Sequence, residues 1–248
     1  MMIFTIAHKE FRTLCALPST WLVLGALQFI FGWFFLARID AFLQVQAQLA
    51  QIANAPGATL AVVTPLFGSI ALVMMLLVPV FTMRMLAEER RNQTLTLLMT
   101  APVSSAHIIL GKFVGLVVFL LLIISACTLM VLTLAAGTAL DIGLLLCNAL
   151  GLLLLTASYT ALGLYISSLT SQPVVAALAA LAALFGLWLV DVSAVDSGTP
   201  WHALAPTSHF LNFNIGLIDS GDLVFFLLFS ATFLMLAILR LHNNRMYG

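Results

Sequence analysis

Six runs of about 20 apolar residues divide this chain, and they constrain its fold more than any other feature. A helix of about 20 residues crosses the hydrocarbon core of a bilayer, and it satisfies its own backbone hydrogen bonds there. The hydrophobic share of 63% and the charged share of 7% are far from the globular averages of about 45–50% and 25%. The sequence therefore predicts an all-α polytopic membrane protein, a single transmembrane domain over residues 1–248, with spans at about 20–38, 65–83, 108–136, 143–168, 173–192 and 222–239.

The few charged residues predict the orientation of these spans. Basic residues concentrate in the cytoplasmic segments of membrane proteins. If the N-terminus is cytoplasmic, Arg38 is the one basic residue outside, and the other eight lie inside: Lys9, Arg12, Arg84, Arg90, Arg91, Lys112, Arg240 and Arg245. Six aspartates then lie outside: Asp40, Asp141, Asp191, Asp196, Asp219 and Asp222. An even number of spans places both termini in the cytoplasm.

The segment before the first span is amphipathic. Apolar residues recur at helical spacing, with Lys9 and Arg12 on the opposite flank and Pro18 after the last of them: Ile3, Phe4, Ala7, Phe11, Leu14 and Cys15. A helix with one apolar and one basic face lies in the membrane interface rather than across it. We expect an interfacial helix over residues 1–18, ending at Pro18.

A tetrad of charges, Glu88-Glu89-Arg90-Arg91, stands between the second and third spans. Each ion would cost about 2.5–3.5 kcal/mol at the centre of a bilayer on insertion scales, so the tetrad must reach water. The loop over residues 84–107 is long enough for a short cytoplasmic helix with Glu88 and Glu89 in its first turn, where the helix dipole favours anions. Ser104 or Ser105 is a good N-cap for the helix that follows. Taken alone, the tetrad fits a solvated loop as well as a docking element for a soluble partner.

The predicted spans contain no ionisable residue at mid-depth, which disfavours proton-coupled transport and intramembrane proteolysis. The three cysteines lack metal-ligand spacing, so no metal, disulfide framework or bound cofactor is expected. A net charge of zero and the absence of a basic stretch exclude nucleic acid as a partner. Five polar residues near the last outer loop fit capping and turn chemistry better than ligand binding: Ser208, His209, Asn212, Asp219 and Asp222.

Small residues mark faces where helices approach each other closely. Gly111 and Gly115 form a GxxxG pair, a weak signal by itself. The fifth span is rich in alanine, and an unusually large face of small residues suits a second subunit. We therefore assign packing against a second subunit, as an expectation, to Ala176, Ala180 and Ala183.

The first cytoplasmic loop has a recognisable pattern. Residues 82–95 (TMRMLAEERRNQTL), 98–104 (LMTAPVS) and 110–113 (LGKF) resemble the corresponding loop of ABC-2-type transporter permeases. Residues 161–170 (ALGLYISSLT) resemble the end of that family's fourth span. The outer-loop pattern around Ser208-His209-Phe210 resembles its gliding-motility and nitrous-oxide-reductase-maturation branch.

The resemblance implies a multi-pass permease subunit of the inner, or cytoplasmic, membrane, in contact with membrane lipid. Such a subunit has no catalytic residues of its own and works with two ABC ATPase subunits, which bind ATP and Mg²⁺. The chain itself contains no GxxxxGK[ST] motif, in agreement with ATP being bound elsewhere. Carried over to this sequence, the resemblance implies an ATPase-coupling helix with contact residues Glu88, Glu89, Arg90, Arg91, Thr94, Leu95 and Leu98. A secondary ATPase contact is expected at Lys9, Glu10 and Arg12.

Three functions remain open at this level. The first is an ATP-driven exporter in which this chain pairs with a second copy or with a paralogous permease. The second is a mechanotransmitting subunit that acts on an extracytoplasmic partner, such as a protein with a large extracytoplasmic domain, without moving a substrate. The third is a scaffold independent of an ATPase, which the charged loop disfavours.

Overall fold

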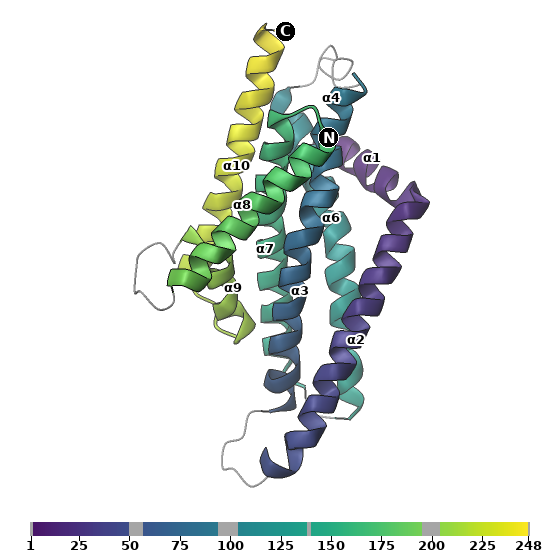
Figure 1. The fold of residues 1–248 in the computed structure, drawn as a ribbon, viewed down its shortest axis with the longest axis vertical. Helices are drawn as coiled ribbons and strands as arrows, with labels where there is room; N and C mark the ends of the chain where they lie inside the picture. Colours follow the sequence, from purple (N-terminus) through teal and green to yellow (C-terminus); the bar gives the residue numbers. More distant parts are fainter. Residues whose placement is uncertain (1, 50–56, 94–103, 138–139, 195–203, 248) are drawn as a thin grey trace.

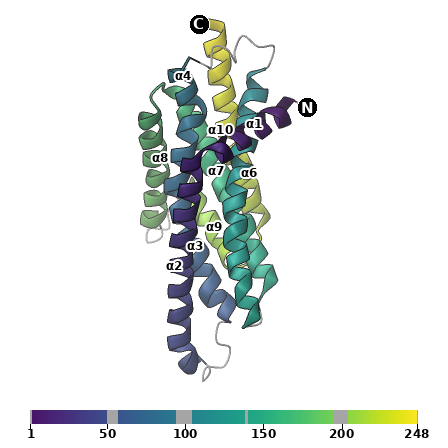
Figure 2. The ribbon, with the colours of Figure 1, turned by 90° about the vertical axis from the view of Figure 1, so that its right-hand side faces the viewer.

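The computed structural model describes residues 2–49, 57–93, 104–137, 140–194 and 204–247. Helices form the bulk of this part of the chain, and the elements run in the order α1 (Met2–Ala16), α2 (Pro18–Leu49), α3 (Ala58–Met83), η1 (Arg84–Glu88), α4 (Glu89–Arg91), α6 (Ser105–Leu132), η2 (Thr133–Ala136), α7 (Ile142–Leu169), α8 (Pro173–Ala194), α9 (Pro206–Asn214) and α10 (Ser220–Tyr247). Long helices stand side by side in one bundle, and both termini lie at the same end of it (Figures 1 and 2).

Six helices within the described residues are long and apolar enough to cross a membrane, as the sequence predicts. They cover Pro18–Val45, Thr59–Arg91, Ser105–Ala135, Ile142–Leu169, Pro173–Ser193 and Ser220–Asn244. The prediction of six spans is confirmed, and each helix begins within a few residues of the predicted start, except that the second begins about one and a half turns earlier.

The helix predicted before the first span is also present, as α1. It ends at Ala16, and α2 begins at Pro18, a favourable first residue for a helix because proline has no N–H to satisfy there. α1 lies across the end of the bundle at a steep angle to α2 (Figures 1 and 2). Its Ala7, Glu10 and Leu14 are buried, while Phe4 is 77% exposed.

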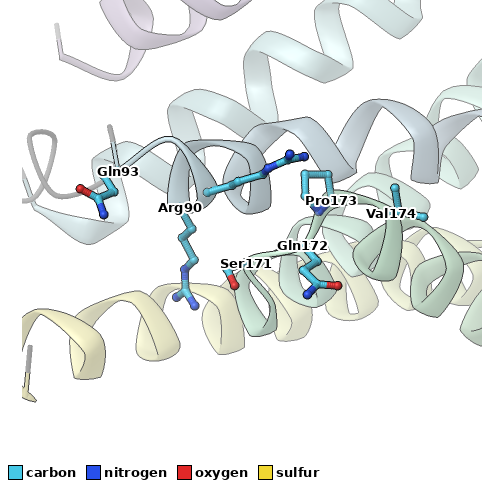
Figure 3. A pocket seen from close by; sticks show the side chains of 7 residues that line it. Arg90, Gln93, Ser171, Gln172, Pro173 and Val174 are labelled. Atoms are coloured by element: carbon cyan, nitrogen blue, oxygen red, sulfur yellow. The ribbon is translucent and has the colours of Figure 1, made fainter.

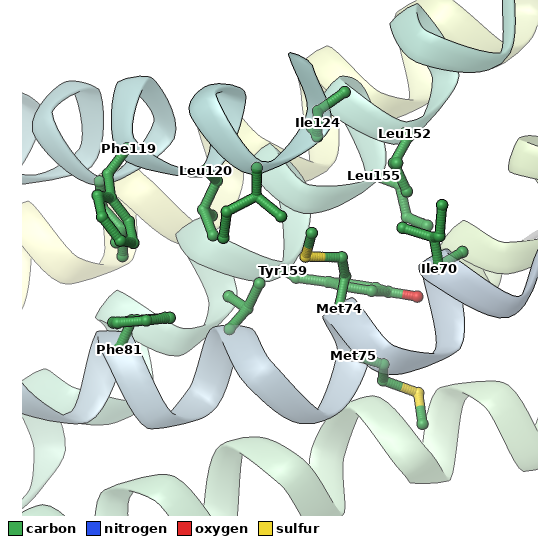
Figure 4. Close-up of a cluster of buried hydrophobic side chains, with 14 of the residues drawn as sticks. Ile70, Met74, Met75, Phe81, Phe119, Leu120, Ile124, Leu152, Leu155 and Tyr159 are labelled. Carbon is green, nitrogen blue, oxygen red and sulfur yellow. The ribbon is translucent and has the colours of Figure 1, made fainter. Parts of the chain in front are cut away.

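The core lies between α3, α6 and α7. Phe81 of α3 and Phe119 of α6 meet edge to face with ring centroids 5.1 Å apart, and Met74 and Tyr159 fill the space farther along (Figure 4). Close packing of this kind is what drives helix association in lipid, where the surrounding chains are as apolar as the side chains. By contrast, α2 leaves large apolar side chains such as Phe29 and Trp33 exposed, as expected of a surface in contact with lipid.

The GxxxG pair of α6 receives α1. A Cβ built on Gly111 would lie 2.7 Å from the Cβ of Ile6, and one on Gly115 would lie 2.9 Å from the backbone oxygen of Ala7. Neither approach leaves room for a side chain, so the two glycines are what allow α1 to pack directly on α6.

We predict that Gly115→Leu displaces α1 and destabilises the protein. The clash involves the backbone of Ala7, which cannot move without moving the helix, and overpacking of this kind typically costs about 1–3 kcal/mol. The measurement is thermal unfolding of the purified protein in detergent. Gly32→Leu is the matched control, because a Cβ on Gly32 meets no atom within 4 Å; an equal loss of stability in both variants would contradict the prediction.

Candidate functional site

The charged tetrad is a direct continuation of the α3 helix. The chain passes from α3 through the π-helical turn η1 into the single turn α4, so Glu88 and Glu89 lie at the C-terminal end of a long helix. This corrects the expectation that they begin a separate helix. Arg90 and Arg91 occupy the last turn, where the helix dipole favours cations. The helix expected within the loop after Gln93 falls on residues 94–103, outside the described residues, together with the predicted contacts Thr94, Leu95 and Leu98.

A buried lysine joins the tetrad to two other helices. The Lys112 ammonium on α6 donates to Glu89 Oε1 at 2.6 Å and to Glu10 Oε1 of α1 at 3.0 Å. The side chain of Lys112 is 1% exposed, that of Glu10 is 10% and that of Glu89 is 21%. An isolated ammonium at such a depth would be very costly, and two carboxylates compensate it through charge-assisted hydrogen bonds. We call Glu10, Lys112 and Glu89 the ion triad.

The close approach of α1 to α6 explains the geometry of the triad. Lys112 lies between Gly111 and Gly115 in the sequence, and both glycines contact α1. The helices are therefore close enough for the Glu10 side chain to reach Lys112 directly. Glu88–Arg91 are called the charged segment below. Glu89 reaches Lys112 from α3 and η1, because these elements extend beyond the apolar core to the same end of the bundle (Figure 1).

The ion triad changes the roles available to the predicted contact residues. Glu10 was expected at a secondary ATPase contact, but it is 8% exposed and its carboxylate binds Lys112. Lys9 and Arg12 are exposed, and the Lys9 ammonium lies 3.7 Å from Glu10. Glu88, Arg91 and Arg84 are exposed. The residues of the charged segment therefore divide into a buried anchor and an accessible surface.

A cavity of about 590 Å³ lies beside the accessible surface. It is bounded by Arg90 and Arg91 on one side and by the start of α8 on the other, with Gln172 and Pro173 at its wall (Figure 3). One terminal nitrogen of Arg90 is shielded from solvent and has no hydrogen-bond partner among the described residues. Arg90 also lies close enough to Arg240 of α10 for the two positive charges to repel each other. The cavity therefore has a cationic wall suited to a carboxylate or another anion.

A second polar cluster joins α9 to α10 at the other end of α8. His209 Nδ1 lies 2.5 Å from Asp222 Oδ1, and Asn212 donates to Asp222 Oδ2 at 2.8 Å. The His209 ring stacks on Phe225 with centroids 3.9 Å apart. These contacts fit the expected structural role of the outer-loop residues. Among the described residues, no three His, Cys, Asp or Glu side chains come together as metal ligands would.

The alanines of α8 lie elsewhere than expected. Ala176 and Ala180 are each 1% exposed, packed inside their own chain where α8 crosses α3 and α7. This corrects their assignment to a contact with a second subunit, because a residue already covered by its own protomer offers no surface to another. Ala183 is partly buried against the same core. The outward face of α8 carries larger side chains instead, Val174, Leu178 and Leu189 among them.

Sequence reasoning assigned Lys112 only to the positive cytoplasmic side and missed its central position. A signal was present, since Lys112 is the one charged residue between Arg91 and Asp141 and lies inside a GxxxG pair. A lone charge on the close-packing face of an apolar helix needs a buried partner. The sequence gives no indication of which carboxylates provide it, because Glu10 and Glu89 lie 102 and 23 residues away.

We predict that Lys112→Met destabilises the protein strongly, by about 3–5 kcal/mol, the usual cost of removing one partner from a buried ion pair. Two carboxylates would remain close together without a cation. The triple variant Lys112→Met, Glu10→Gln and Glu89→Gln should recover most of the loss, because it removes the stranded charges too. Chemical unfolding in detergent measures both variants. Lys9→Met, which removes an exposed ammonium beside the same Glu10, is the control and should have little effect; a loss as large as that of Lys112→Met would contradict the assignment.

Comparison with known proteins agrees with this architecture. The model of the family described as ABC-2 family transporter protein matches residues 4–240, which includes all six candidate spans nearly in full, the ion triad and the charged segment. No match was found among curated proteins. The match covers nearly the whole chain, and the chain therefore belongs to the ABC-2 transporter family of multi-pass membrane proteins.

Proposed function

We propose that this chain is the permease subunit of an ATP-driven exporter and that a separate ABC ATPase binds its charged segment. The observation that carries the proposal is the double attachment of that segment. It is continuous with α3, and Lys112 ties it to α1 and α6. A displacement of the exposed end is therefore transmitted to three helices at once.

The chemistry of the exposed end suits a protein partner. Glu88 and Arg91 are exposed, and the cavity beside Arg90 and Arg91 has room for side chains of a docked surface. Charged groups at the rim of an interface give orientation and specificity. On the orientation that the basic residues predict, this end of the bundle is cytoplasmic, where the ATPase subunits lie. A permease worked by a cytoplasmic ATPase would lie in the cytoplasmic membrane, which is part of this proposal.

We predict that Glu88→Arg combined with Arg91→Glu weakens the complex with the ABC ATPase. The exchange keeps the net charge but reverses the pattern that a partner meets, and opposed like charges at an interface are unfavourable. Glu89 is left unchanged because it anchors the segment internally. The measurement is recovery of a candidate ABC ATPase from the same genome after co-expression and affinity purification, followed by its ATP hydrolysis rate.

The matched control for this exchange is Arg38→Asp combined with Asp40→Arg. Both residues are exposed and lie near the far end of α2, away from the charged segment (Figure 1). The control should recover the ATPase as the wild type does. Unchanged recovery and unchanged hydrolysis with the Glu88 and Arg91 exchange would refute the proposed docking surface.

An apolar groove supports a lipid-like cargo. A groove of about 410 Å³ runs between α3, α8 and α9, and its lining is mainly apolar, with Leu72, Trp188 and Phe210 among the residues. Asp191 is the acidic residue at its wall, and Thr207 donates to it at 2.6 Å. Sites of this size with few polar groups accept amphipathic molecules. Export of a lipid or a similarly apolar compound is the form of transport that this groove favours.

The packed core favours the second candidate, a subunit that transmits motion to an extracytoplasmic partner. Side chains such as Phe119, Leu155 and Tyr159, each at most 2% exposed, fill the centre of the bundle (Figure 4). A protomer with such a core moves as a unit, and force on its cytoplasmic end can reach the opposite end without a path for cargo. The two candidates share the ATPase contact and differ in whether a molecule crosses the membrane.

We predict that the complex moves fluorescent phospholipid across proteoliposome membranes when ATP is present, and that Ser69→Trp abolishes this movement. Ser69 lines the groove, and an indole would occupy much of it. Leu76→Trp, on an exposed part of the same helix, is the control and should move lipid as the wild type does. ATP hydrolysis by the wild-type complex without any lipid movement would refute lipid export and support transmission.

A further inference from the structure

The helix that carries the charged segment changes to a π-helical turn near its end, and a side chain from another helix bonds its backbone there. Residues Arg84–Glu88 form the π-helical turn η1 between α3 and α4. In a regular α-helix the Ala87 N–H would donate to the Met83 carbonyl, four residues back. Here the Ala87 N–H donates to Ser167 Oγ of α7 at 3.1 Å, and Ser167 Oγ donates to the Met83 oxygen at 3.3 Å. The serine hydroxyl is inserted between the two groups that would otherwise bond.

The insertion is fully buried. Ala87 and Ser167 are each 0% exposed, so water does not compete for the two backbone groups. A buried N–H without a partner is costly, and the hydroxyl satisfies both the N–H and the carbonyl at once. Insertion of a side chain between backbone groups that are four residues apart is a recognised cause of local helix distortion. The Ser167 hydroxyl therefore stands in for the α-helical hydrogen bond between Ala87 and Met83 that this turn lacks.

The packing one turn before Ser167 fixes its depth. The Cα of Gly163 lies against the side chain of Thr82, and a Cβ at Gly163 would overlap the Thr82 side chain. Thr82 is 1% exposed. This contact sets how far α7 slides along α3, and it brings the Ser167 hydroxyl opposite the gap between Met83 and Ala87.

We propose that Ser167 is a positioning residue that sets the angular position of the charged segment. A π-helical turn holds one residue more than an α-helical turn. If the turn closed into a regular α-helix, every residue after it would rotate about the helix axis by up to about 100°, the angle of one residue. Glu89 would leave Lys112, and Arg90 and Arg91 would leave the cavity at the start of α8.

The π-helical turn is then a two-state element at this end of the bundle. In one state Ser167 is inserted and the ion triad is complete; in the other Ser167 is withdrawn, the helix is regular and Lys112 keeps Glu10 alone. Movement of α7 relative to α3 exchanges the two states. This last step rests on the proposed function, because the charged segment transmits such a movement only if an ATPase binds it.

The position of Asn92 reports the state of the turn. Thr13 of α1 and Asn92 after α4 are both exposed and line one cavity of about 350 Å³. In a variant lacking Cys15, Cys127 and Cys147, cysteines at Thr13 and Asn92 should cross-link with a short bifunctional thiol reagent. Ser167→Ala should abolish most of the cross-linking, because the helix closes and carries Asn92 off the cavity. The protein alone in nanodiscs suffices for this measurement.

Two further variants separate this effect from a general loss of packing. Ser168→Ala is the matched control, since Ser168 is 1% exposed and, within the part of the chain that the structure describes, its hydroxyl donates to the Tyr165 carbonyl of its own helix; it should cross-link as the wild type does. Deletion of Ala87 in the Ser167→Ala background removes the extra residue, so a regular helix then returns Asn92 to its original angle. Cross-linking should recover in that variant.

The inference is overturned if Ser167→Ala cross-links as well as the wild type, if Ser168→Ala loses as much, or if deletion of Ala87 gives no recovery. Unfolding of Ser167→Ala without rescue by the deletion would count against it equally. These outcomes are independent of the ATPase. Failure of the Glu88 and Arg91 exchange to affect the ATPase would remove the proposed function while leaving Ser167 as the residue that positions the segment.

Discussion

The Lys112 ammonium, buried between Glu10 and Glu89, makes the interaction on which the end of the bundle that carries the charged segment depends. A bundle of apolar helices has little directional chemistry, since packing alone allows helices to slide and rotate. One buried cation with two carboxylates restricts three segments that are distant in sequence. Separating Lys112 from either carboxylate would leave a buried charge without its partner, which is costly.

Several features of the fold exist to place that charge. Gly111 and Gly115 let α1 approach α6 closely enough for a short acidic side chain to reach the lysine. Thr82 against Gly163 sets α3 on α7, and the π-helical turn then directs Glu89 inward and Glu88 outward. The exposed Glu88 and Arg91 are thus held in place by Glu89 of the same segment, which bonds the buried Lys112. An interaction with the outward residues therefore acts on an element whose position is already determined.

The sequence predicts the six spans well because their length and hydropathy alone identify them. It predicts α1 because apolar residues at helical spacing indicate a helix with one apolar face. It also identifies the charged segment, since ions cannot remain in lipid. It does not predict that the charged segment ends a helix instead of beginning one. Glu88 and Glu89 are favourable in a first turn, but the continuation of α3 places them in the last turns of a long helix. The alanines of α8 show a similar limit: small residues indicate close packing, but not whether the neighbour belongs to the same chain. Nothing in the local sequence around Ser167 or Lys112 indicates their bonding partners, because those partners come from other helices.

The π-helical turn has a consequence for how sequences of this family are compared. A regular helix would need one residue fewer between Thr82 and the charged segment, and a single hydroxyl on α7 accommodates the difference. Relatives without a hydroxyl at the position of Ser167 should be one residue shorter here, so that a correct alignment carries a gap in the middle of a helix. Alignments that forbid gaps inside helices would pair every charged residue of this segment with the wrong neighbour.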